Sequence, residues 1–373
     1  MKYVTLKDVC TINMGQSPDS DSYNDNGEGV PFFQGNADFG ERYPVTRKWC
    51  SAPTKMAAPE DILISVRAPI GAMNYAKEEC CIGRGLAALT PDKTKVSPKF
   101  IFWLLKGKNA ELNSKGTGST FKAIGRKVLE ETKVPDISLE KQLEHSETLE
   151  KIYAVIQHRK SELQMLDDLI KARFVEMFGD PVHSDKYGTR KLSSCVAEKT
   201  DMVDGPFGSQ VNTKIDYIAK GEIPVIRTVN VKKMSFSPVD LKYMTRKKYE
   251  TVIRSQVLPG DVILTKVGTI GNVCVFPDTY KEAVLSTTGS CRIRVDNSIV
   301  NTEFFAYNLL YLKSKLLEIA SAGVQPFLNM NHVKNIDILN VPLGKQTKFA
   351  DFVHQVDKSK VAVQKALDET QML

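Results

Sequence analysis

The residues that could bind phosphate form two glycine motifs, and neither motif is complete. Gly107-Lys108 has the Gly-Lys pair of a nucleotide-binding P-loop, but Asn109 follows where that loop needs Ser or Thr. The segment from Gly83 to Ala88 contains the glycine spacing of a dinucleotide site. Pro91 follows it at once, so no helix can begin there to receive a phosphate. The sequence therefore predicts no nucleotide or dinucleotide cofactor in this chain.

Acid–base, nucleophilic and metal chemistry also lack a complete set of residues. Pro135-Asp136 precedes Glu140-Lys141, which loosely resembles a nuclease site, but the spacing is wrong and these acids suit the start of a helix. The chain has no NPPY or DPPY tetrad of amino-methyltransferases, and its 5 histidines are scattered. Its 7 cysteines contain no CxxC pair and indicate reduced thiols, not zinc ligands or disulfides. We therefore predict a protein that is not an enzyme and holds no metal.

The elements that organise the chain begin with the stretch from Leu139 to Gly179, which predicts one long helix. It has no proline and no internal glycine, and Gly179 and Pro181 should end it. Arg159 and Arg173 interrupt the d positions of its heptad pattern. The apolar a/d residues are Leu149, Ile152, Ile156, Leu163, Leu166, Ile170 and Met177. A lone helix cannot bury such a stripe, so we expect a partner helix.

The C-terminal stretch supplies a candidate for that partner. The apolar residues with matching spacing there are Phe349, Phe352, Val356, Val363, Ala366 and Leu373. Two matching stripes in one chain favour an intramolecular coiled coil. The alternative is that both are amphipathic helices of an ordinary core.

The two halves of the sequence repeat the same blocks in the same order, each before one of these helices. The first half reads as short strands and turns, with a short helix near residues 97–106. The paired segments are 31–34 with 224–227, 59–65 with 259–265, 70–71 with 270–271, 85–89 with 289–293, 99–105 with 303–310, the loops ending at Phe121 and Phe327, and 134–135 with 341–342. This order indicates a duplicated mixed α/β unit, each copy followed by a helix.

The overall composition is that of an ordinary globular protein, with 42% hydrophobic and 25% charged residues. A formal net charge of +7 permits a nucleic-acid partner without requiring one. No apolar run follows Met1, and no stretch approaches the roughly 20 apolar residues that a membrane span needs. We expect no membrane association and a cytoplasmic location.

The duplicated unit, its long helices and the segment DDLIKARFVEMFGDP (Asp167 to Pro181) resemble the specificity subunits of type I restriction–modification systems. The second helix departs from this pattern because it has no counterpart of RFVEMFGD. The resemblance implies an α+β fold with two target recognition domains and an antiparallel coiled coil. The expected boundaries are residues 1–138 and 188–342 for the two domains, 139–180 for the central helix and 343–373 for the C-terminal helix.

The resemblance also implies partners. Each domain would read one half of a bipartite site in double-stranded DNA, and the helices would fix the gap between the half-sites. Two methylation subunits would dock on the helices and bring S-adenosylmethionine, for which this chain would have no pocket. Restriction and motor subunits would join the same complex.

The residue types on the loops agree with DNA reading, because bases and phosphates are contacted by Arg, Lys, Asn, Gln, Ser and Thr held on a rigid scaffold. The candidates in the first half are Gln16, Ser17, Gln34, Asn36, Arg67, Arg84, Lys115, Thr117, Ser119 and Lys122. Those in the second half are Ser209, Gln210, Arg227, Asn230, Lys266, Thr269, Gln325, Asn329 and Asn331. Lys115, Thr117, Ser119 and Lys122 suit phosphate contacts. For each of these residues the alternative is a solvated loop side chain.

Two other functions remain open at this stage. A transcription regulator could carry two DNA-binding domains on a coiled coil, although the sequence has no clear helix-turn-helix signature. A structural coiled-coil adaptor would leave the two divergent, polar-loop-rich copies unexplained. The sequence does not give the DNA target, because contacts to base edges and to DNA shape follow no letter code.

Overall fold

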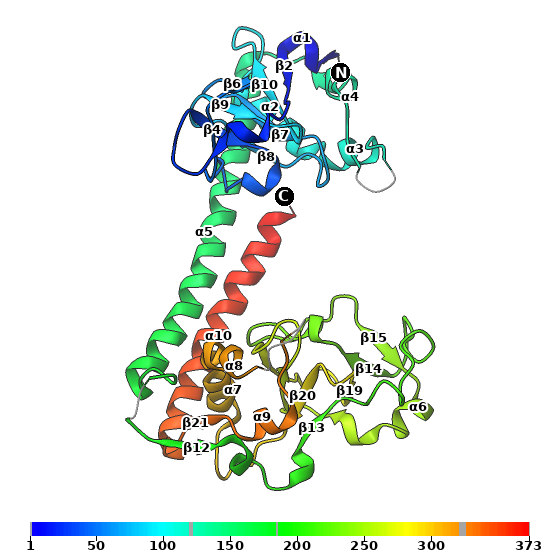
Figure 1. Cartoon of the computed structure of the whole chain (residues 1–373), viewed down its shortest axis with the longest axis vertical. Helices are drawn as coiled ribbons and strands as arrows, with labels where there is room; N and C mark the ends of the chain where they lie inside the picture. The colour runs from blue at the N-terminus through cyan, green and yellow to red at the C-terminus, as the bar shows by residue number, and fades with distance from the viewer. Residues whose placement is uncertain (1, 119–121, 184–185, 321–325, 373) are drawn as a thin grey trace. The chain divides into compact units, whose positions relative to one another are not determined.

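The computed structural model describes residues 2–118, 122–183, 186–320 and 326–372. The chain divides into two compact units, Met1–Gln157 and His158–Leu373, here called unit 1 and unit 2 (Figure 1). Helix α5 (Leu139–Phe178) begins in unit 1 and ends in unit 2. At about 1.5 Å per residue, its 40 residues span about 60 Å.

Unit 1 has two larger sheets that share a core and, among the described residues, one two-stranded sheet. A four-stranded sheet has the order β2-β10-β7-β8, a five-stranded sheet has the order β3-β5-β4-β9-β6, and β1 pairs with β11. The strands are β1 (Tyr3–Thr5), β2 (Cys10–Met14), β3 (Tyr23–Asn24), β4 (Val30–Phe33), β5 (Trp49–Cys50), β6 (Met56–Ala57), β7 (Ile62–Ser65), β8 (Met73–Tyr75), β9 (Cys80–Ile82), β10 (Leu86–Pro91) and β11 (Lys133–Pro135). The short helices are α1 (Leu6–Val9), α2 (Pro98–Gly107), α3 (Asn109–Ser114) and α4 (Arg126–Glu130).

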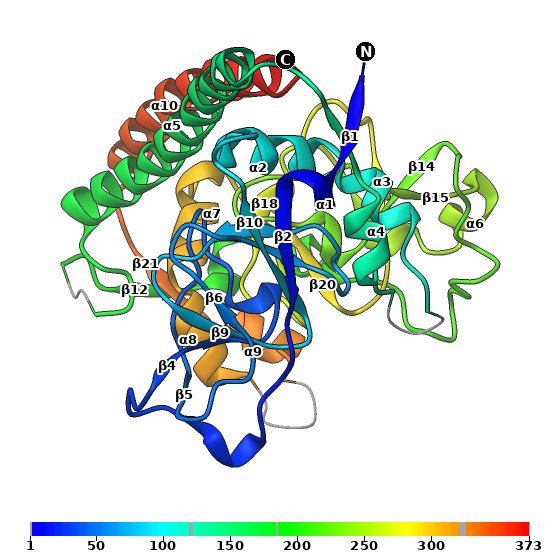
Figure 2. The ribbon, with the colours of Figure 1, turned by 90° about the horizontal axis from the view of Figure 1, so that it is seen from above.

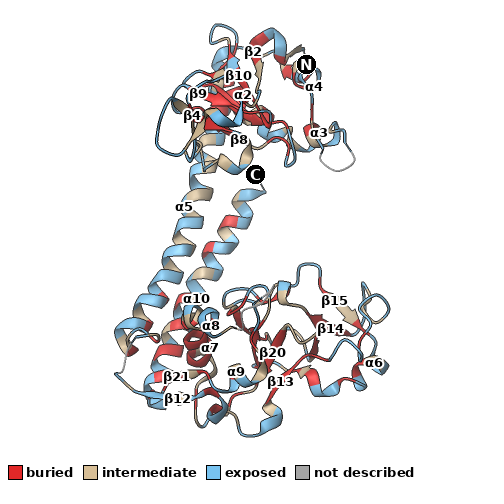
Figure 3. Cartoon of the chain, viewed as in Figure 1, coloured by how far each residue is buried: buried red, intermediate tan, exposed pale blue. Residues whose placement is uncertain are grey.

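Strand β7 shows how the sequence builds these layers. Its four residues are all buried, because successive side chains point to opposite faces and both faces are covered. Ile62 and Ile64 pack in a cluster with Ile101 of α2, and Leu63 packs in a second cluster with Ile82 of β9. The four-stranded sheet therefore lies between the helices and the five-stranded sheet, and its buried residues are visible in Figure 3.

Unit 2 repeats this topology, except that among the described residues its second sheet has four strands and no counterpart of β3. Its sheets have the orders β13-β20-β17-β18 and β15-β14-β19-β16, and β12 pairs with β21. The strands are β12 (Thr189–Lys191), β13 (Met202–Asp204), β14 (Ile223–Ile226), β15 (Lys242–Met244), β16 (Gln256–Val257), β17 (Val262–Thr265), β18 (Val273–Val275), β19 (Ala283–Leu285), β20 (Ser290–Ile293) and β21 (Asp337–Leu339). The helices are α6 (Arg246–Glu250), α7 (Thr302–Tyr311), α8 (Lys313–Ile319), α9 (Met330–Lys334) and α10 (Leu343–Gln371).

Local details confirm that the two units are copies of one fold. Each has one parallel strand pair, β4 with β9 and β14 with β19, among antiparallel neighbours. Asp61 accepts a hydrogen bond from the backbone N–H of Ala58 at 2.8 Å, and Asp261 accepts one from Leu258 at 2.7 Å. Gln142 accepts from the N–H of Ser97 at 2.9 Å, as Gln346 does from Asn301 at 2.8 Å. The predicted duplicated α+β unit is therefore present.

Two of the predicted block pairings were wrong in register. Phe327 forms a β-bridge with Val267, and the residue that forms the equivalent bridge with Arg67 is Ala123, not Phe121. Phe121 itself lies outside the described residues. Val134-Pro135 lies in β11, whose counterpart β21 ends at Leu339, so Val341-Pro342 is not its equivalent. The loops before these points differ in composition, so the sequence could not fix the alignment.

In unit 2, α10 lies antiparallel beside the part of α5 that follows His158 (Figures 1 and 2). Phe349 of α10 packs against Phe174 with ring centroids 5.3 Å apart, and Lys360, further along α10, pairs with Asp167 at 2.7 Å. Residue numbers therefore rise along α10 as they fall along α5. The predicted antiparallel pairing of the two helices is confirmed.

The side chains that form this contact differ in part from the predicted stripe. Near its end α5 buries Ile170, Phe174 and Phe178, four residues apart, whereas the predicted Met177 is only partly buried. On α10 the predicted Phe349, Val356 and Val363 are buried, but Val353 and Leu367 are buried in place of Phe352 and Ala366, which are intermediate. Leu373 lies outside the described residues. The stripe shifts because the aromatic end of α5 packs against α7 as well as α10.

The two arginines in the α5 stripe keep their charged ends at the edge of the contact. The Arg173 guanidinium lies 5.7 Å from the ring centre of Phe352 and donates to Glu176 at 2.7 Å. Arg159 donates to Glu162 at 2.9 Å. Such side chains cover apolar surface with their methylene groups while the charge stays solvated. Arginine at these positions is therefore compatible with the helix pair.

No helix in the described part of the chain is both long and apolar enough to cross a membrane. Within residues 2–118, 122–183, 186–320 and 326–372, no three His, Cys, Asp or Glu side chains come together as metal ligands would. The seven cysteines are buried and free. Burial raises the pKa of the Cys10 thiol to about 12, so this sulfur stays a neutral thiol.

Candidate nucleic-acid interface

Four of the predicted contact residues in unit 1 line one cavity of about 440 Å³. They are Gln34, Asn36, Arg67 and Arg84. Lys48 and Asp38, which the sequence did not single out, contribute to the same wall. The cavity therefore gathers residues that lie up to 50 positions apart in the sequence and that suit hydrogen bonds to a polar ligand.

The strands of unit 1 position these side chains at one edge of its sheets. Because β4 and β9 are parallel, their carboxyl ends meet, and these ends lead to Gln34 and Arg84. Arg67 follows β7 in the other sheet. Two backbone hydrogen bonds join the three segments, from Gly85 to the carbonyl of Gln34 at 3.1 Å and from Val66 to the carbonyl of Gly85 at 2.9 Å.

Glycine is required where these segments cross. A Cβ atom on Gly85 would lie 2.4 Å from the carbonyl oxygen of Gln34, and one on Gly15 would lie 2.2 Å from that of Gly83. Real Cβ atoms do not approach oxygen so closely. The glycines between Gly83 and Ala88, which resemble a dinucleotide fingerprint, therefore serve close packing of the backbone.

The electrostatics of the cavity favour a ligand with hydrogen-bond acceptors. Arg67 and Arg84 are exposed, and among the described residues neither guanidinium makes a hydrogen bond or ion pair. Among the described residues of the lining, Asp38 is the one carboxylate, and it accepts the backbone N–H groups of Gln34 at 2.8 Å and Gly35 at 3.3 Å. Lys48 lies 3.8 Å from Asp25, with both side chains exposed. The lining therefore presents more unpaired positive than negative charge.

Gln16 and Ser17 join the same edge. The backbone N–H of Arg84 donates to the Ser17 hydroxyl at 3.3 Å, and the N–H of Gln16 donates to the carbonyl of Ile82 at 3.0 Å. Gln16 is exposed and Ser17 is half-buried. These two predicted residues therefore lie beside the Arg84 turn.

The predicted phosphate-contacting loop is closed by the backbone pair of Thr117 and Ala123, with hydrogen bonds of 2.9 and 3.0 Å. Lys122 is exposed, and its carbonyl accepts the N–H of Ala68 at 3.0 Å, which places this loop next to Arg67. Lys115 pairs with Glu111 at 2.6 Å, and Lys108 and Lys115 together lower the pKa of Glu111 to about 2. Ser119 lies outside the described residues. Lys122 is thus better placed than Lys115 to meet a phosphate.

In unit 2 the predicted cations are already paired within the protein. Lys266 is buried and lies 3.5 Å from Asp204. Arg227 is half-buried, and its guanidinium donates to the Asp240 carboxylate at 2.8 Å. The pKa of Asp240 is lowered to about 2, first by Lys242 and then by Arg227. Because Lys266 is buried, its side chain has no surface for a DNA contact, and the prediction for this residue is wrong.

Two predicted asparagines of unit 2 shape loops. Asn230 is fully buried, donating to the carbonyls of Ser237 and Val239 at 2.9 and 3.1 Å and accepting from the N–H of Arg227 at 3.1 Å. Like Asp38 in unit 1, Asn230 accepts the backbone N–H three residues earlier, so it caps a turn and the prediction that it contacts DNA is wrong. Asn329 caps α9 by accepting from the N–H of His332 at 2.8 Å.

The other predicted residues of unit 2 remain on its surface. Ser209, Gln210, Thr269 and Asn331 are exposed. The Gln210 side chain accepts from the N–H of Phe207 at 3.0 Å, and Asn331 accepts from Asn335 at 3.2 Å. Gln325 lies outside the described residues. Exposed apolar residues also lie on these loops, among them Phe207, Val229 and Phe327, and the sequence pattern gave no indication of them.

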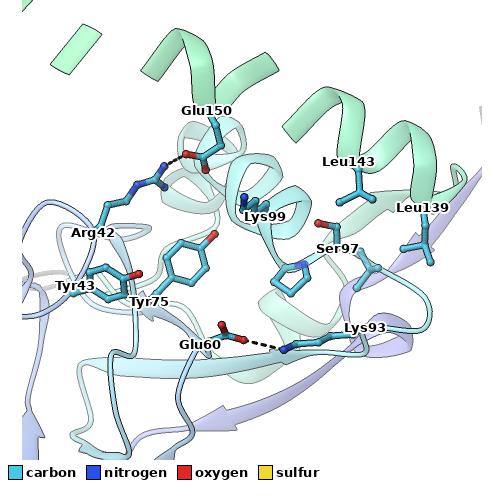
Figure 4. A pocket seen from close by; sticks show the side chains of 12 residues that line it. Arg42, Tyr43, Glu60, Tyr75, Lys93, Ser97, Lys99, Leu139, Leu143 and Glu150 are labelled. Atoms are coloured by element: carbon cyan, nitrogen blue, oxygen red, sulfur yellow. Dashed lines mark hydrogen bonds and ion pairs between the residues drawn. The ribbon is translucent and has the colours of Figure 1, made fainter. Parts of the chain in front are cut away.

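A second cavity of unit 1, of about 630 Å³, lies beside the start of α5 (Figure 4). The Arg42 guanidinium, which pairs with Glu150 of α5, lies over the rings of Trp103 and Tyr153. Trp103 also donates to Glu150 at 2.9 Å. At the other side Lys93 pairs with Glu60 at 2.8 Å. These contacts hold the first turns of α5 on the globular part of unit 1.

Both halves of the chain match one family of known proteins. Residues 1–165 and 205–370 both match the family described as the type I restriction modification DNA specificity domain. The chain is 44% identical over 156 residues to a Methanocaldococcus jannaschii protein named as the MjaX type I restriction enzyme specificity subunit. That match covers 42% of this chain and 37% of the relative, so it spans little more than a third of the relative's length.

Two further matches extend over most of the chain. The MjaIX type I restriction enzyme specificity subunit of the same organism is 23% identical over 327 residues, covering 82% of this chain and 73% of that protein. The crystal structure of the type I restriction–modification S subunit from M. genitalium superposes with a TM-score of 0.54 at 15% identity. It covers 100% of this chain and 93% of that chain, which shows a shared fold.

Proposed function

Since this chain belongs to the family of type I restriction modification DNA specificity domains, we propose that it is the DNA-reading subunit of a type I restriction–modification complex. Each unit reads one half of a bipartite site in double-stranded DNA. The observation that carries this proposal is that one fold occurs twice with different side chains at the same edge. Unit 1 presents Arg67 and Arg84 there, and unit 2 presents Val267 and Thr288.

The proposed reading domains are residues 1–138 and 188–342. The helices 139–180 and 343–373 then connect them and set the distance between the half-sites. Each added turn of helix lengthens a segment by about 5.4 Å, which exceeds the rise of about 3.4 Å for one base pair. A helix pair of fixed length is therefore suited to select one spacing.

Catalysis belongs to partner subunits in this proposal. Two methylation subunits dock on the helices and supply the S-adenosylmethionine site, and restriction and motor subunits complete the assembly in the cytoplasm. The support for a non-catalytic role comes from the sequence alone, in which no complete nucleotide, methyltransferase or nuclease motif occurs. The methylation chemistry then depends on this chain for the choice of DNA site.

A reconstitution experiment tests the proposal. The purified chain is incubated with duplex DNA and radiolabelled S-adenosylmethionine, alone and together with the methylation subunit of its own system. We expect methyl transfer to specific sites in the complex and none with either component alone. Transfer by the isolated chain, or transfer by the methylation subunit with unchanged sequence preference when this chain is omitted, would contradict the proposal.

A further inference from the structure

The two units present different chemistry at equivalent positions. In unit 1, the residue two positions after β7 is Arg67 and the residue before Gly85 is Arg84; both are exposed and their guanidiniums are unpaired among the described residues. Gln34 is exposed and Asn36 half-buried beside them, and neither side chain makes a hydrogen bond within the described part of the chain. This edge of unit 1 therefore presents side-chain hydrogen-bond donors without partners among the described residues, all around one cavity.

The equivalent edge of unit 2 carries apolar and hydroxyl side chains where unit 1 has the two arginines. The backbone hydrogen bond from Val66 to Gly85 in unit 1 corresponds to the one from Lys266 to Gly289 in unit 2. Val267 is therefore equivalent to Arg67, and Thr288 is equivalent to Arg84. Phe327, 44% exposed, pairs with Val267 as Ala123 pairs with Arg67. In the turn after β14, Val229 is 54% exposed.

The cations of unit 2 near this edge do not replace the missing donors. Arg227 is held by Asp240, and Lys266 is buried against Asp204. Beside this edge, Phe327 exposes ring surface next to Val267, and Val229 exposes its methyl groups in the turn after β14. The two units therefore differ in the kind of contact that they offer to DNA.

The two kinds of contact suit different base pairs in the major groove. Guanine presents two acceptors, O6 and N7, and the planar fork of arginine donates to both at once. Thymine presents a C5-methyl group, and apolar side chains contact it. Free arginines therefore suit a half-site that contains guanine, and exposed valine and phenylalanine side chains suit one that contains thymine.

We propose that unit 1 reads guanine in its half-site through Arg67 and Arg84, and that unit 2 reads thymine methyl groups through Val229 and Phe327. This inference rests on the proposed function. It assigns the two half-sites different compositions: the half read by unit 1 contains at least one G·C pair, and the half read by unit 2 contains A·T pairs whose thymine methyl groups face the protein.

The test uses the full chain assembled with its methylation subunits and expressed in cells that lack other methylation. Methylome sequencing gives the recognition motif of the wild type and of the Arg67→Lys, Arg84→Lys and Val229→Ser variants. Lysine keeps the positive charge but loses the two-pronged geometry. Lys127→Ala is the matched control, because Lys127 is an 83% exposed cation of unit 1 on α4.

The expected result is a loss of discrimination at single positions. Each arginine variant should lower the preference for guanine by about ten-fold or more at one position of one half-site, and leave the other half-site unchanged. Val229→Ser should relax a thymine position in the opposite half-site. The Lys127→Ala control should keep the wild-type motif.

Other outcomes overturn the inference. A unit 1 half-site without guanine, or arginine variants that keep the wild-type motif, would show that these residues do not read guanine. Arg67→Ala and Arg84→Ala variants that weaken every sequence equally, with a smaller salt dependence, would make these arginines phosphate contacts. A wild-type complex that methylates no defined motif would instead refute the proposed function itself.

Discussion

Phe174 is a fully buried side chain that joins the end of α5 to the other helices of unit 2. Its ring centre lies 5.0 Å from Phe178, 5.7 Å from Phe304 and 5.3 Å from Phe349. These contacts join the end of α5 to α7 and α10. Phe174→Ala should therefore loosen the helix pair and the globular core of unit 2 together.

The size of the effect follows from this burial. Replacing a fully buried phenylalanine by alanine costs about 3–5 kcal/mol, because apolar surface is lost and a cavity remains. With a urea dependence of about 3 kcal/mol per molar for a unit of this size, the midpoint of unit 2 should fall by about 1–2 M. Val175→Ala is the matched control on the same helix; Val175 is 41% exposed, so its midpoint should barely move.

The two tryptophans of the chain make the assay selective. Trp49 and Trp103 both lie in unit 1, and Trp103 packs on α5 through Tyr153 at 5.4 Å. Tryptophan fluorescence therefore follows unit 1, while far-ultraviolet circular dichroism follows both units. Phe174→Ala should shift a dichroism transition and leave the fluorescence transition in place. A shift of less than about 0.5 M, or an equal shift of the fluorescence transition, would refute this account of the packing.

Two more predictions concern single charges. Burial, and then Asp357, raise the pKa of the Glu303 carboxyl above its ordinary 4.5, while His354 lowers it. A raised pKa favours folding at a pH below about 4.5 and opposes it as the pH rises through the folded-state value, so Glu303→Gln should raise Tm at pH 7–8 and not at pH 4. A gain that is equal at both pH values would contradict this cause. Lys122→Ala should weaken binding to all DNA sequences about equally and reduce the salt-dependence slope by about one. A changed sequence preference with an unchanged slope would make Lys122 a base-contacting residue instead.

The long elements were predictable because their signals are local. The absence of proline and glycine between Leu139 and Phe178, followed by Gly179 with a φ of +83° and then Pro181, defines α5 from the sequence. The duplication was also predictable, since blocks such as 59–65 and 259–265 keep their order and their buried strand pattern. Periodicity and turn residues are properties of neighbouring positions, which a single sequence contains.

The contacts made across long separations were not predictable. The sequence suggests that Lys266 is a free cation on a loop. Its partner Asp204 lies 62 positions earlier, and the ion pair between them explains why Lys266 is buried. Asn230 reads as a base-contacting residue, yet the turn after β14 uses it as an internal cap, as the turn after β4 uses Asp38. Phe174 and Phe178 fall outside the strict heptad, and only the position of α7 shows why they are buried.

The cavity lined by Gln34, Arg67 and Arg84 in unit 1 was predictable in part. The residue types at Gln34, Arg67 and Arg84 indicated polar contacts, and the structure brings these three side chains to one wall. Their convergence follows from the parallel pairing of β4 with β9, which the sequence pattern did not specify. The exposed Val229 and Phe327 were missed because apolar loop residues in a single sequence give no indication of a ligand.

Exchange of one reading domain is the measurement that tests the central claim most directly. Residues 1–138 are replaced by the corresponding domain of another family member; the boundary follows β11, because β1 pairs with β11 and both must come from one source. Methylome sequencing then compares the motif with that of the parent complex. We predict that one half-site changes, while the other half-site and the spacing between them stay the same. A change in both half-sites, or in neither, would contradict the claim that each unit reads its own half of the DNA site.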